Sequence, residues 1–160
     1  MNGRYENGAL PEKVRLLYEA VLAMVTDGWD INRMKVSDIT AQAGIGKGTA
    51  YEYFSSKEEI IANAVLYDVE MRLAHVLEIT KGEGDFAGKF VQILTYMEEV
   101  FAKRQAFCLL VRIGTGSYEV SESMRRECEK RQQALGCHLA DRIVESLMCQ
   151  ACRKYDRGDE

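Results

Sequence analysis

The sequence predicts an all-α protein. Its 160 residues include a single proline, at position 11, and few runs in which apolar and polar residues alternate as they do in strands. Apolar residues recur instead at the three- and four-residue spacing of amphipathic helices. With 47% hydrophobic residues, a chain of this length can bury a core as one domain or one and a half.

The first helix is predicted to begin at Pro11 and to end before Gly28. Proline suits a first helical turn because its missing N–H would be unpaired there, and glycine can take the left-handed conformation that ends a helix. The apolar side of this helix consists of Val14, Leu17, Ala20, Val21 and Met24. We expect Trp29, which follows, to lie in the small core under the next two helices; a stacking role is the alternative.

Two short helices joined by a tight turn are predicted between residues 36 and 54. Ser37 and Asp38 suit the first turn of the first of them, and Gly44 accepts the positive φ that the turn requires. One side of the pair carries Ile39, Ala43, Ala50 and Phe54, and the other carries Lys47, Gly48, Thr49, Tyr51 and Tyr53. This layout is that of a helix-turn-helix, whose second helix enters the DNA major groove.

Glycine at position 48 is unusual because it lies inside the second of these helices. A glycine there costs about 1 kcal/mol relative to alanine. It is explained if a side chain at this position would collide with a phosphate or a base edge.

Longer helices are predicted after residue 54. A capping box, Ser56-x-x-Glu59, opens a helix that ends near Thr80, before the break at 81–84. Asp85 can cap the next helix, on whose apolar side we expect Phe86, Phe90, Ile93, Leu94, Met97, Val100 and Phe101. A bend at residues 104–105, a short apolar helix at 107–113, a break at 114–117 and a last helix at about 121–154 complete the prediction.

Five motifs occur together between residues 17 and 61. They are Asp27-Gly28-Trp29, Val36-Ser37-Asp38-Ile39, Ala43-Gly44-Ile45-Gly46-Lys47-Gly48-Thr49, Tyr51-x-Tyr53-Phe54 and Ser56-Lys57-Glu58-Glu59. This segment, about a third of the chain, resembles the N-terminal domain of TetR-family transcriptional regulators. The resemblance implies a three-helix DNA-binding domain at 1–56, with its helix-turn-helix at 36–54, and a helical effector-binding domain at 57–160.

The resemblance also implies a function. It implies a sequence-specific regulator, expected to be a homodimeric repressor that a small-molecule effector releases from double-stranded operator DNA. Members of the family usually continue into two more helices that form the dimer interface, whereas the end of this chain, at 153–160, is typical of a connecting loop. We therefore expect that the chain lacks its last dimerisation helices.

The DNA-binding face is carried over position by position. It comprises Lys35, Ser37, Gly46, Lys47, Gly48, Thr49, Tyr51, Tyr53 and Lys57. The resemblance implies that Lys47 and Lys57 neutralise phosphates, that the two tyrosines bind the backbone, and that Thr49 contacts bases. The overall charge gives little support to DNA binding, because DNA-binding domains are usually basic. Here the net charge is −4, and residues 1–60 hold seven Lys and Arg against nine Asp and Glu.

The effector pocket is predicted from long or aromatic side chains on helices that should pack together. These are Tyr67, Met71, His75, Phe90, Tyr96, Met97, Phe101, Phe107, Leu110, Arg112, Tyr118 and Met124. An ordinary helical core is the alternative for most of them. Arg112, within an apolar run, is interpreted either as the partner of an anionic ligand or as the partner of a nearby carboxylate.

Other functional classes have less support in the sequence. Cys137-His138 and Cys149-x-x-Cys152 lie about 16 Å apart along one predicted helix, so they cannot share a zinc ion, and we predict no metal and no cofactor. The sequence contains no nucleophile motif and no Glu-x-x-His pair of the kind found in di-iron helical bundles, so we do not expect an enzyme. No run of 18 apolar residues and no signal peptide is present, so we expect a cytoplasmic protein.

One alternative function remains open. It is a helical small-molecule- or partner-binding module with a degenerate DNA-binding head. The acidic balance favours it, as do three departures from the family pattern: Thr40, Ala50 and Glu52.

Overall fold

The computed structural model describes residues 10–103, 109, 112–113 and 118–131, and within them every regular element is a helix. The helices are α1 (Glu12–Thr26), α2 (Val36–Ala43), α3 (Lys47–Tyr53), α4 (Lys57–Lys81), α5 (Phe86–Lys103) and a further helix at 122–131. The all-α prediction is therefore confirmed. The predicted helix at 107–113 lies mostly outside the described residues, and the predicted last helix, at about 121–154, is described only as far as residue 131.

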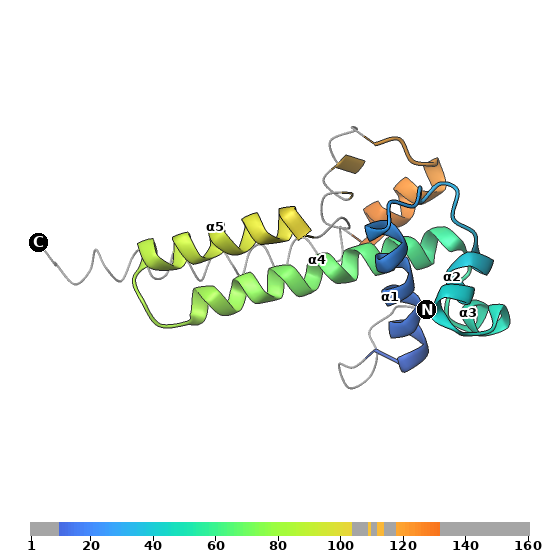
Figure 1. The fold of residues 1–160 in the computed structure, drawn as a ribbon, viewed down its shortest axis with the longest axis horizontal. Coiled ribbons are helices and arrows are strands. Elements are labelled where there is room, and N and C mark those ends of the chain that lie inside the picture. The colour runs from blue at the N-terminus through green and yellow to red at the C-terminus, as the bar shows by residue number, and fades with distance from the viewer. Residues whose placement is uncertain (1–9, 104–108, 110–111, 114–117, 132–160) are drawn as a thin grey trace, which may run out of the picture.

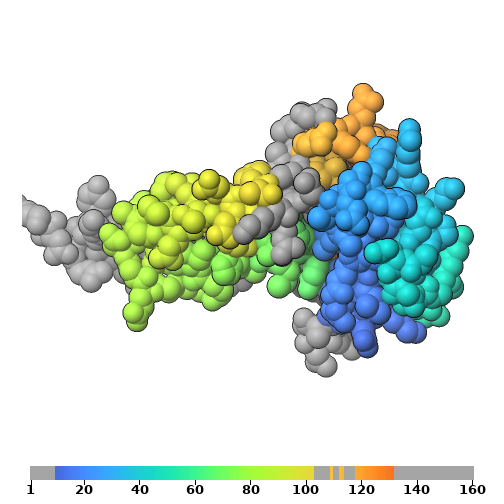
Figure 2. Space-filling view, viewed as in Figure 1, coloured from blue at the N-terminus to red at the C-terminus, as the bar shows by residue number. Residues whose placement is uncertain are grey.

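The molecule has a compact head and a long arm (Figure 1). α1, α2 and α3 pack together around the beginning of α4, and α4 then runs out of the head beside α5, which returns antiparallel to it. The space-filling view shows the same division, with the head in blue and cyan and the arm in green and yellow (Figure 2).

One hydrophobic core joins the head to the beginning of α4. All five apolar positions predicted for the first helix are buried, and so are Ile39, Ala50 and Phe54 of the helix-turn-helix. The same cluster includes residues 60–62 and 64–65 of α4, together with Leu109, Ile113, Met124 and Cys128. The division into domains at residue 56 stays a prediction, and α4 packs into the head beyond it.

Glycine ends α1 and α2 as the sequence predicts. Gly28 has φ of 83°, and two amides close the end of α1: Gly28 N–H donates to the Val25 carbonyl at 3.1 Å, and Trp29 N–H to the Met24 carbonyl at 3.0 Å. This is the Schellman arrangement. Gly44 has φ of 67° and makes the turn between α2 and α3.

The expectation that Trp29 is buried under the helix-turn-helix is wrong. Its side chain is 51% exposed. The place in the core is filled instead by Ile31 and Met34, which are 1% and 0% exposed. Trp29 directly follows the left-handed turn at Gly28, and it lies beside a small cavity on the outside of the head.

The capping box at the start of α4 is only half correct. Ser56 Oγ accepts a hydrogen bond from the Glu59 N–H at 3.1 Å, as predicted. The Glu59 carboxylate, however, accepts from the N–H of Ser55 at 2.7 Å rather than from that of Ser56. The predicted cap of the next helix is present, because Asp85 Oδ1 accepts from the Gly88 N–H at 2.9 Å.

The predicted apolar side of α5 is mostly uncovered. Of its seven residues only Val100 is buried, whereas Phe86, Phe90, Leu94 and Phe101 are between 42% and 54% exposed. α4 covers a narrower strip of α5, which includes Lys89, Tyr96 and Val100 at helical spacing. Lys89 is buried there and its ammonium donates to the Thr80 carbonyl at 3.0 Å.

Candidate nucleic-acid interface and ligand cavity

The turn at Gly44 holds α3 across the head with one face outward. Ala50 is fully buried, and Phe54 packs against Tyr18 of α1 with 6.0 Å between ring centroids. The Thr40 hydroxyl, buried on α2, donates to the Val36 carbonyl at 2.9 Å. Two of the departures from the family pattern, Thr40 and Ala50, thus leave the helix-turn-helix packed and this buried hydroxyl hydrogen-bonded.

Most predicted DNA-binding residues lie on the outward face. The exposed ones are Lys35, Ser37, Gly46, Lys47, Gly48, Tyr51 and Tyr53. Tyr51 is 50% exposed and Tyr53 is 38% exposed, and Thr49 is half-buried. Glu52 is exposed on the same short helix. α3 therefore presents hydroxyl groups, one lysine and two glycines to solvent.

The space around Gly48 is open. A Cβ atom placed there would meet no atom within 4 Å, and the backbone of Gly48 is not in the left-handed region. At Gly46 the nearest contact would be Thr49 Oγ1 at 3.9 Å. The packing of the protein itself therefore does not require glycine at position 48.

Lys57 lies at the edge of this face and already has a protein partner. Its ammonium donates to the Asn32 carbonyl at 2.8 Å, and the Glu58 carboxylate lies 3.9 Å away. The side chain is 27% exposed. Lys57 thus fixes the loop between α1 and α2 in addition to any contact with phosphate.

Sequence reasoning missed a polar link between that loop and the segment at 118–120. The Tyr118 hydroxyl donates to Asp30 Oδ1 at 2.7 Å, and the Asn32 side-chain amide donates to the Glu119 carbonyl at 2.9 Å. The hydrogen bond from Tyr118, aided by the Asn32 N–H, lowers the pKa of Asp30. Burial, followed by the hydrogen bond to Asp30, raises the pKa of Tyr118. No local signal predicts contacts between residues 87 and 88 positions apart.

Two residues predicted for the effector pocket lie at this link. The guanidinium carbon of Arg112 lies 5.2 Å from the centre of the Tyr118 ring, a cation–π arrangement. Both side chains line a cavity of about 360 Å³ beside Trp29. The structure therefore assigns Arg112 and Tyr118 to the boundary of the head.

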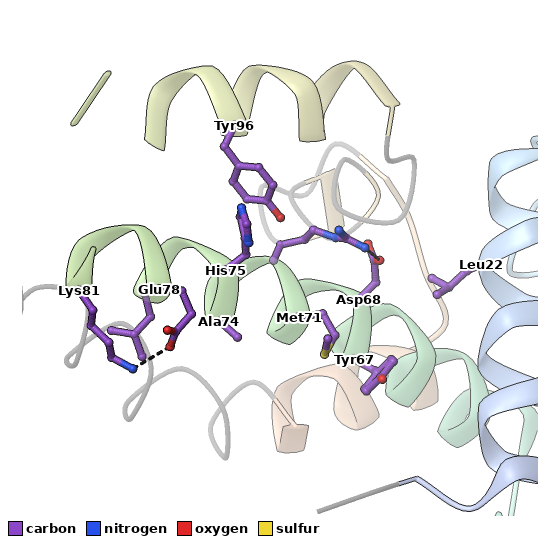
Figure 3. A pocket seen from close by; sticks show the side chains of 11 residues that line it. Leu22, Tyr67, Asp68, Met71, Ala74, His75, Glu78, Lys81 and Tyr96 are labelled. Carbon is purple, nitrogen blue, oxygen red and sulfur yellow. Dashed lines mark hydrogen bonds and ion pairs between the residues drawn. The ribbon is translucent and has the colours of Figure 1, made fainter. Parts of the chain in front are cut away.

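A larger cavity of about 810 Å³ runs along α4, with Tyr96 of α5 and Leu22 of α1 at its edges (Figure 3). It is lined by Leu22, Tyr67, Asp68, Met71, Arg72, Ala74, His75, Leu77, Glu78, Lys81 and Tyr96. Of the residues predicted for an effector pocket, Tyr67, Met71, His75 and Tyr96 are among them. Its volume is within the range of small-molecule sites.

The other predicted pocket residues do not line this cavity. Phe90 and Phe101 are exposed on α5, and Met97 is half-buried on α5. Met124 is buried in the core of the head. Phe107 and Leu110 lie outside the described residues.

A buried ion pair that the sequence analysis did not identify lies in the wall of the larger cavity. Arg72 Nη2 lies 3.0 Å from Asp68 Oδ1, and the Asp68 side chain is only 5% exposed. Burial opposes the charge of Arg72, but the Asp68 carboxylate and the nearby Tyr96 phenol outweigh it, so the pKa of Arg72 is raised. The spacing of four residues between Asp68 and Arg72 predicts an ion pair on one side of a helix, but such pairs usually lie on the solvent-exposed side.

Three polar atoms at this cavity have no hydrogen-bond partner within the part of the chain that the structure describes. They are Asp68 Oδ2, Arg72 Nε and the Tyr96 hydroxyl. The ring of Tyr96 also packs on that of His75, with 4.5 Å between centroids and an angle of 50°. Each of these three atoms exposes less than 1 Å² of surface, so none of them is open to the cavity as it stands.

The described residues contain neither a candidate membrane-spanning helix nor a candidate metal site. No helix there is both long and apolar enough to cross a bilayer. No group of three or more His, Cys, Asp and Glu side chains that could hold a metal ion occurs in the same part of the chain. Cys128 is a buried free thiol whose pKa is raised by burial; the other four cysteines lie outside the described residues.

Comparison with known proteins gives two matches. Residues 30–64 match the family described as bacterial regulatory proteins, tetR family. Over 132 residues the chain is 25% identical to the protein named "Uncharacterized HTH-type transcriptional regulator YuxN" of Bacillus subtilis (strain 168). That match covers 81% of this chain and 44% of the relative, so it spans less than half of the relative's length. No solved structure matches the chain.

Proposed function

Because the chain belongs to the TetR family of DNA-binding, helix-turn-helix transcriptional regulators, we propose that it is a repressor that leaves its operator when a small molecule binds. The family is one of regulators rather than enzymes. We further propose that the full-length protein is a homodimer that works in the cytoplasm. Its two recognition helices would then read half-sites about 34 Å apart.

Gly48 is the observation that carries the DNA-binding proposal. It lies in the first turn of α3, where glycine costs helix stability and where no neighbouring atom excludes a side chain. A residue that the fold does not require is explained by close approach of a ligand to the backbone. In a helix-turn-helix, that ligand is a DNA phosphate or base edge.

The remaining contacts follow from this placement. Lys47 and Lys57 are proposed to neutralise phosphates, and Tyr51 and Tyr53 to donate to the backbone. Thr49 is proposed to contact a base edge beside the backbone of Gly46 and Gly48. Lys35 and Ser37, exposed at the start of α2, are proposed to bind the phosphates that flank the groove.

The effector is proposed to bind in the larger cavity, which runs along α4. α4 is one helix of 25 residues, its beginning is buried in the core of the head, and residues 67–81 contribute to the wall of the cavity. A molecule that shifts α4 therefore acts on the helix that packs against α1, and α1 in turn contacts α3.

The DNA-binding test uses the purified full-length protein and labelled DNA from upstream of its own gene. We expect binding that weakens steeply with salt, and Lys47→Ala should lower the salt slope by about one. Lys81→Ala is the matched control, because it removes the same charge at the far end of α4. Equal effects of the two substitutions would exclude a specific role for Lys47.

The alternative is a ligand-binding module whose head no longer binds DNA. The exposed carboxylate of Glu52 on α3 favours it, because it would lie close to phosphates. Failure of the dimeric, full-length protein to bind any upstream DNA at low salt would support this alternative and contradict the repressor.

A further inference from the structure

We propose that Glu52 is a specificity-determining residue, whose carboxylate accepts a hydrogen bond from the amino group of a cytosine in the major groove of the operator. The inference rests on the proposed function, because it requires that α3 enter that groove. It adds to the proposed function the base that the operator presents to the middle of α3.

The first argument is the side of α3 on which Glu52 lies. Each residue of an α-helix is rotated by about 100° from the one before it. Ala50, which is 0% exposed, marks the side of α3 that faces the core. Glu52 follows it by two residues, so it is rotated by about 200° and lies nearly opposite to the buried side. Its side chain is exposed, as this placement requires.

The second argument is the neighbour of Glu52 on that outward side. Gly48 lies four residues earlier, and residues at this spacing are adjacent on the surface of a helix. A Cβ atom at Gly48 would meet no atom within 4 Å, so the backbone there is open to a close approach. Figure 1 shows α3 at the end of the head, far from α5. A groove that approaches α3 at Gly48 therefore also receives the side chain of Glu52.

The third argument is that the protein does not neutralise this carboxylate. Among the described residues, Glu52 makes no ion pair and no side-chain hydrogen bond. The residues three and four positions away from it are Gly48, Thr49, Ser55 and Ser56, and none of them is a cation. The negative charge of Glu52 is thus available to a partner outside the chain.

The chemistry of DNA selects cytosine as that partner. A carboxylate beside the phosphates is repelled, and that position is the one that favours the alternative function. In the groove, guanine and thymine present acceptors to a carboxylate, and adenine presents an acceptor, N7, next to its amino group. Cytosine presents an amino group alone, so it is the base whose edge a carboxylate matches best.

The test selects binding sites from a random duplex library with the purified full-length protein and measures affinities by fluorescence anisotropy. We expect a fixed C·G pair in each half-site, whose replacement by any other pair weakens binding about tenfold. Glu52→Gln should change the preferred base at that position from cytosine to adenine, because an amide can donate to N7 and accept from the amino group. Glu52→Ala should leave less than threefold discrimination there, with the other positions unchanged.

Glu70→Gln is the matched control, because it makes the same carboxylate-to-amide change on an exposed part of α4. It should leave every base preference unchanged. Because Glu52 is exposed, its variants should keep the melting temperature of the unaltered protein, which separates a changed preference from unfolding.

Two results would overturn the proposal. One is a set of base preferences that neither substitution of Glu52 alters; a uniform gain of affinity for all sequences would then place the carboxylate beside phosphates. The other is the selection of sites without a fixed C·G pair by the unaltered protein, which does not depend on how the variants fold.

Failure of the proposed function gives a different result. If the library yields no bound DNA at low salt, both the repressor and the role of Glu52 are refuted. If DNA is selected but Glu52 does not influence the choice of base, only the role of Glu52 is refuted.

Discussion

Replacing Gly48 with alanine is expected to raise the stability of the fold while lowering its affinity for DNA. The substitution adds one methyl group to the first turn of α3. That methyl group meets no atom within 4 Å, and the backbone of Gly48 does not have the positive φ at which a side chain is strained. Nothing in the packed protein therefore opposes the alanine.

The expected gain in stability follows from helix propensity. Alanine is favoured over glycine by about 1 kcal/mol inside a helix, and we expect about 0.5–1 kcal/mol in a first turn. In a chain of 160 residues this corresponds to a rise in the melting temperature of about 1–4 °C. The expected loss of DNA affinity is at least about tenfold, or about 1.4 kcal/mol, because a methyl group would intrude where the backbone approaches the groove.

Two measurements on the same preparation test this reasoning. Urea denaturation gives the free energy of unfolding, and fluorescence anisotropy with operator DNA gives the dissociation constant. Gly88→Ala is the contrasting variant, because its Cβ would lie 2.9 Å from Asp85 Oδ1, the atom that caps α5. We expect the lost cap to offset the gain in propensity there, and DNA binding to remain unchanged.

Each result has a distinct meaning. A less stable Gly48→Ala protein would show that the start of α3 is more closely surrounded than the structure indicates. A more stable protein with unchanged DNA affinity would show that α3 does not approach DNA through this turn.

Three further substitutions test neighbouring contacts. Lys57→Ala should weaken binding to all DNA sequences and lower the salt slope of DNA binding by about one. The lost hydrogen bond to the Asn32 carbonyl should also reduce the free energy of unfolding by under about 1 kcal/mol. An unchanged salt slope would show that Lys57 does not contact phosphate. Tyr51→Phe should lower operator affinity without changing the melting temperature, because the side chain is 50% exposed; unfolding would instead make Tyr51 a core residue. Tyr118→Phe should destabilise the protein by under about 1 kcal/mol at pH 7. The folded pKa of Asp30 lies below its usual 3.8, so the difference in unfolding free energy between the unaltered protein and Tyr118→Phe should shrink as the pH falls below about 3.8. Urea titrations at several pH values measure this difference. A difference that is independent of pH would contradict the role of the Asp30–Tyr118 bond.

Local signals were sufficient for the head. Gly28 and Gly44 end their helices with φ of 83° and 67°, which few residues other than glycine adopt, so both ends could be predicted from residue type. The buried side of α1 followed from helical spacing because a single stripe meets a single core. The outward face of α3 followed for the same reason.

Features that depend on competition for space could not be predicted. Trp29 is the largest apolar residue near the head, yet Ile31 and Met34 occupy the core because the turn at Gly28 leaves them, rather than Trp29, directed inward. The apolar side of α5 is wider than the strip that α4 covers, and periodicity alone does not reveal which part is covered.

The ligand cavity shows the same limit. His75 and Tyr96 could be proposed from residue type, but Asp68 and Arg72 have the spacing of an ordinary surface ion pair. In the folded protein Asp68 is buried, and Tyr96 of α5 lines the same cavity, which spacing along the chain does not reveal. The link from Asp30 to Tyr118 depends likewise on contacts across 88 positions.

The head is connected to the rest of the molecule in two ways among the described residues. α4 is about 37 Å long and runs from the core of the head along the cavity. The bonds from Tyr118 and Asn32 tie the loop before α2 to the segment at 118–120. A ligand releases DNA only to the extent that it binds one arrangement of these connections more tightly than the other. In the proposed mechanism, a hundredfold loss of operator affinity therefore requires that the ligand prefer one arrangement a hundredfold, which is about 2.7 kcal/mol.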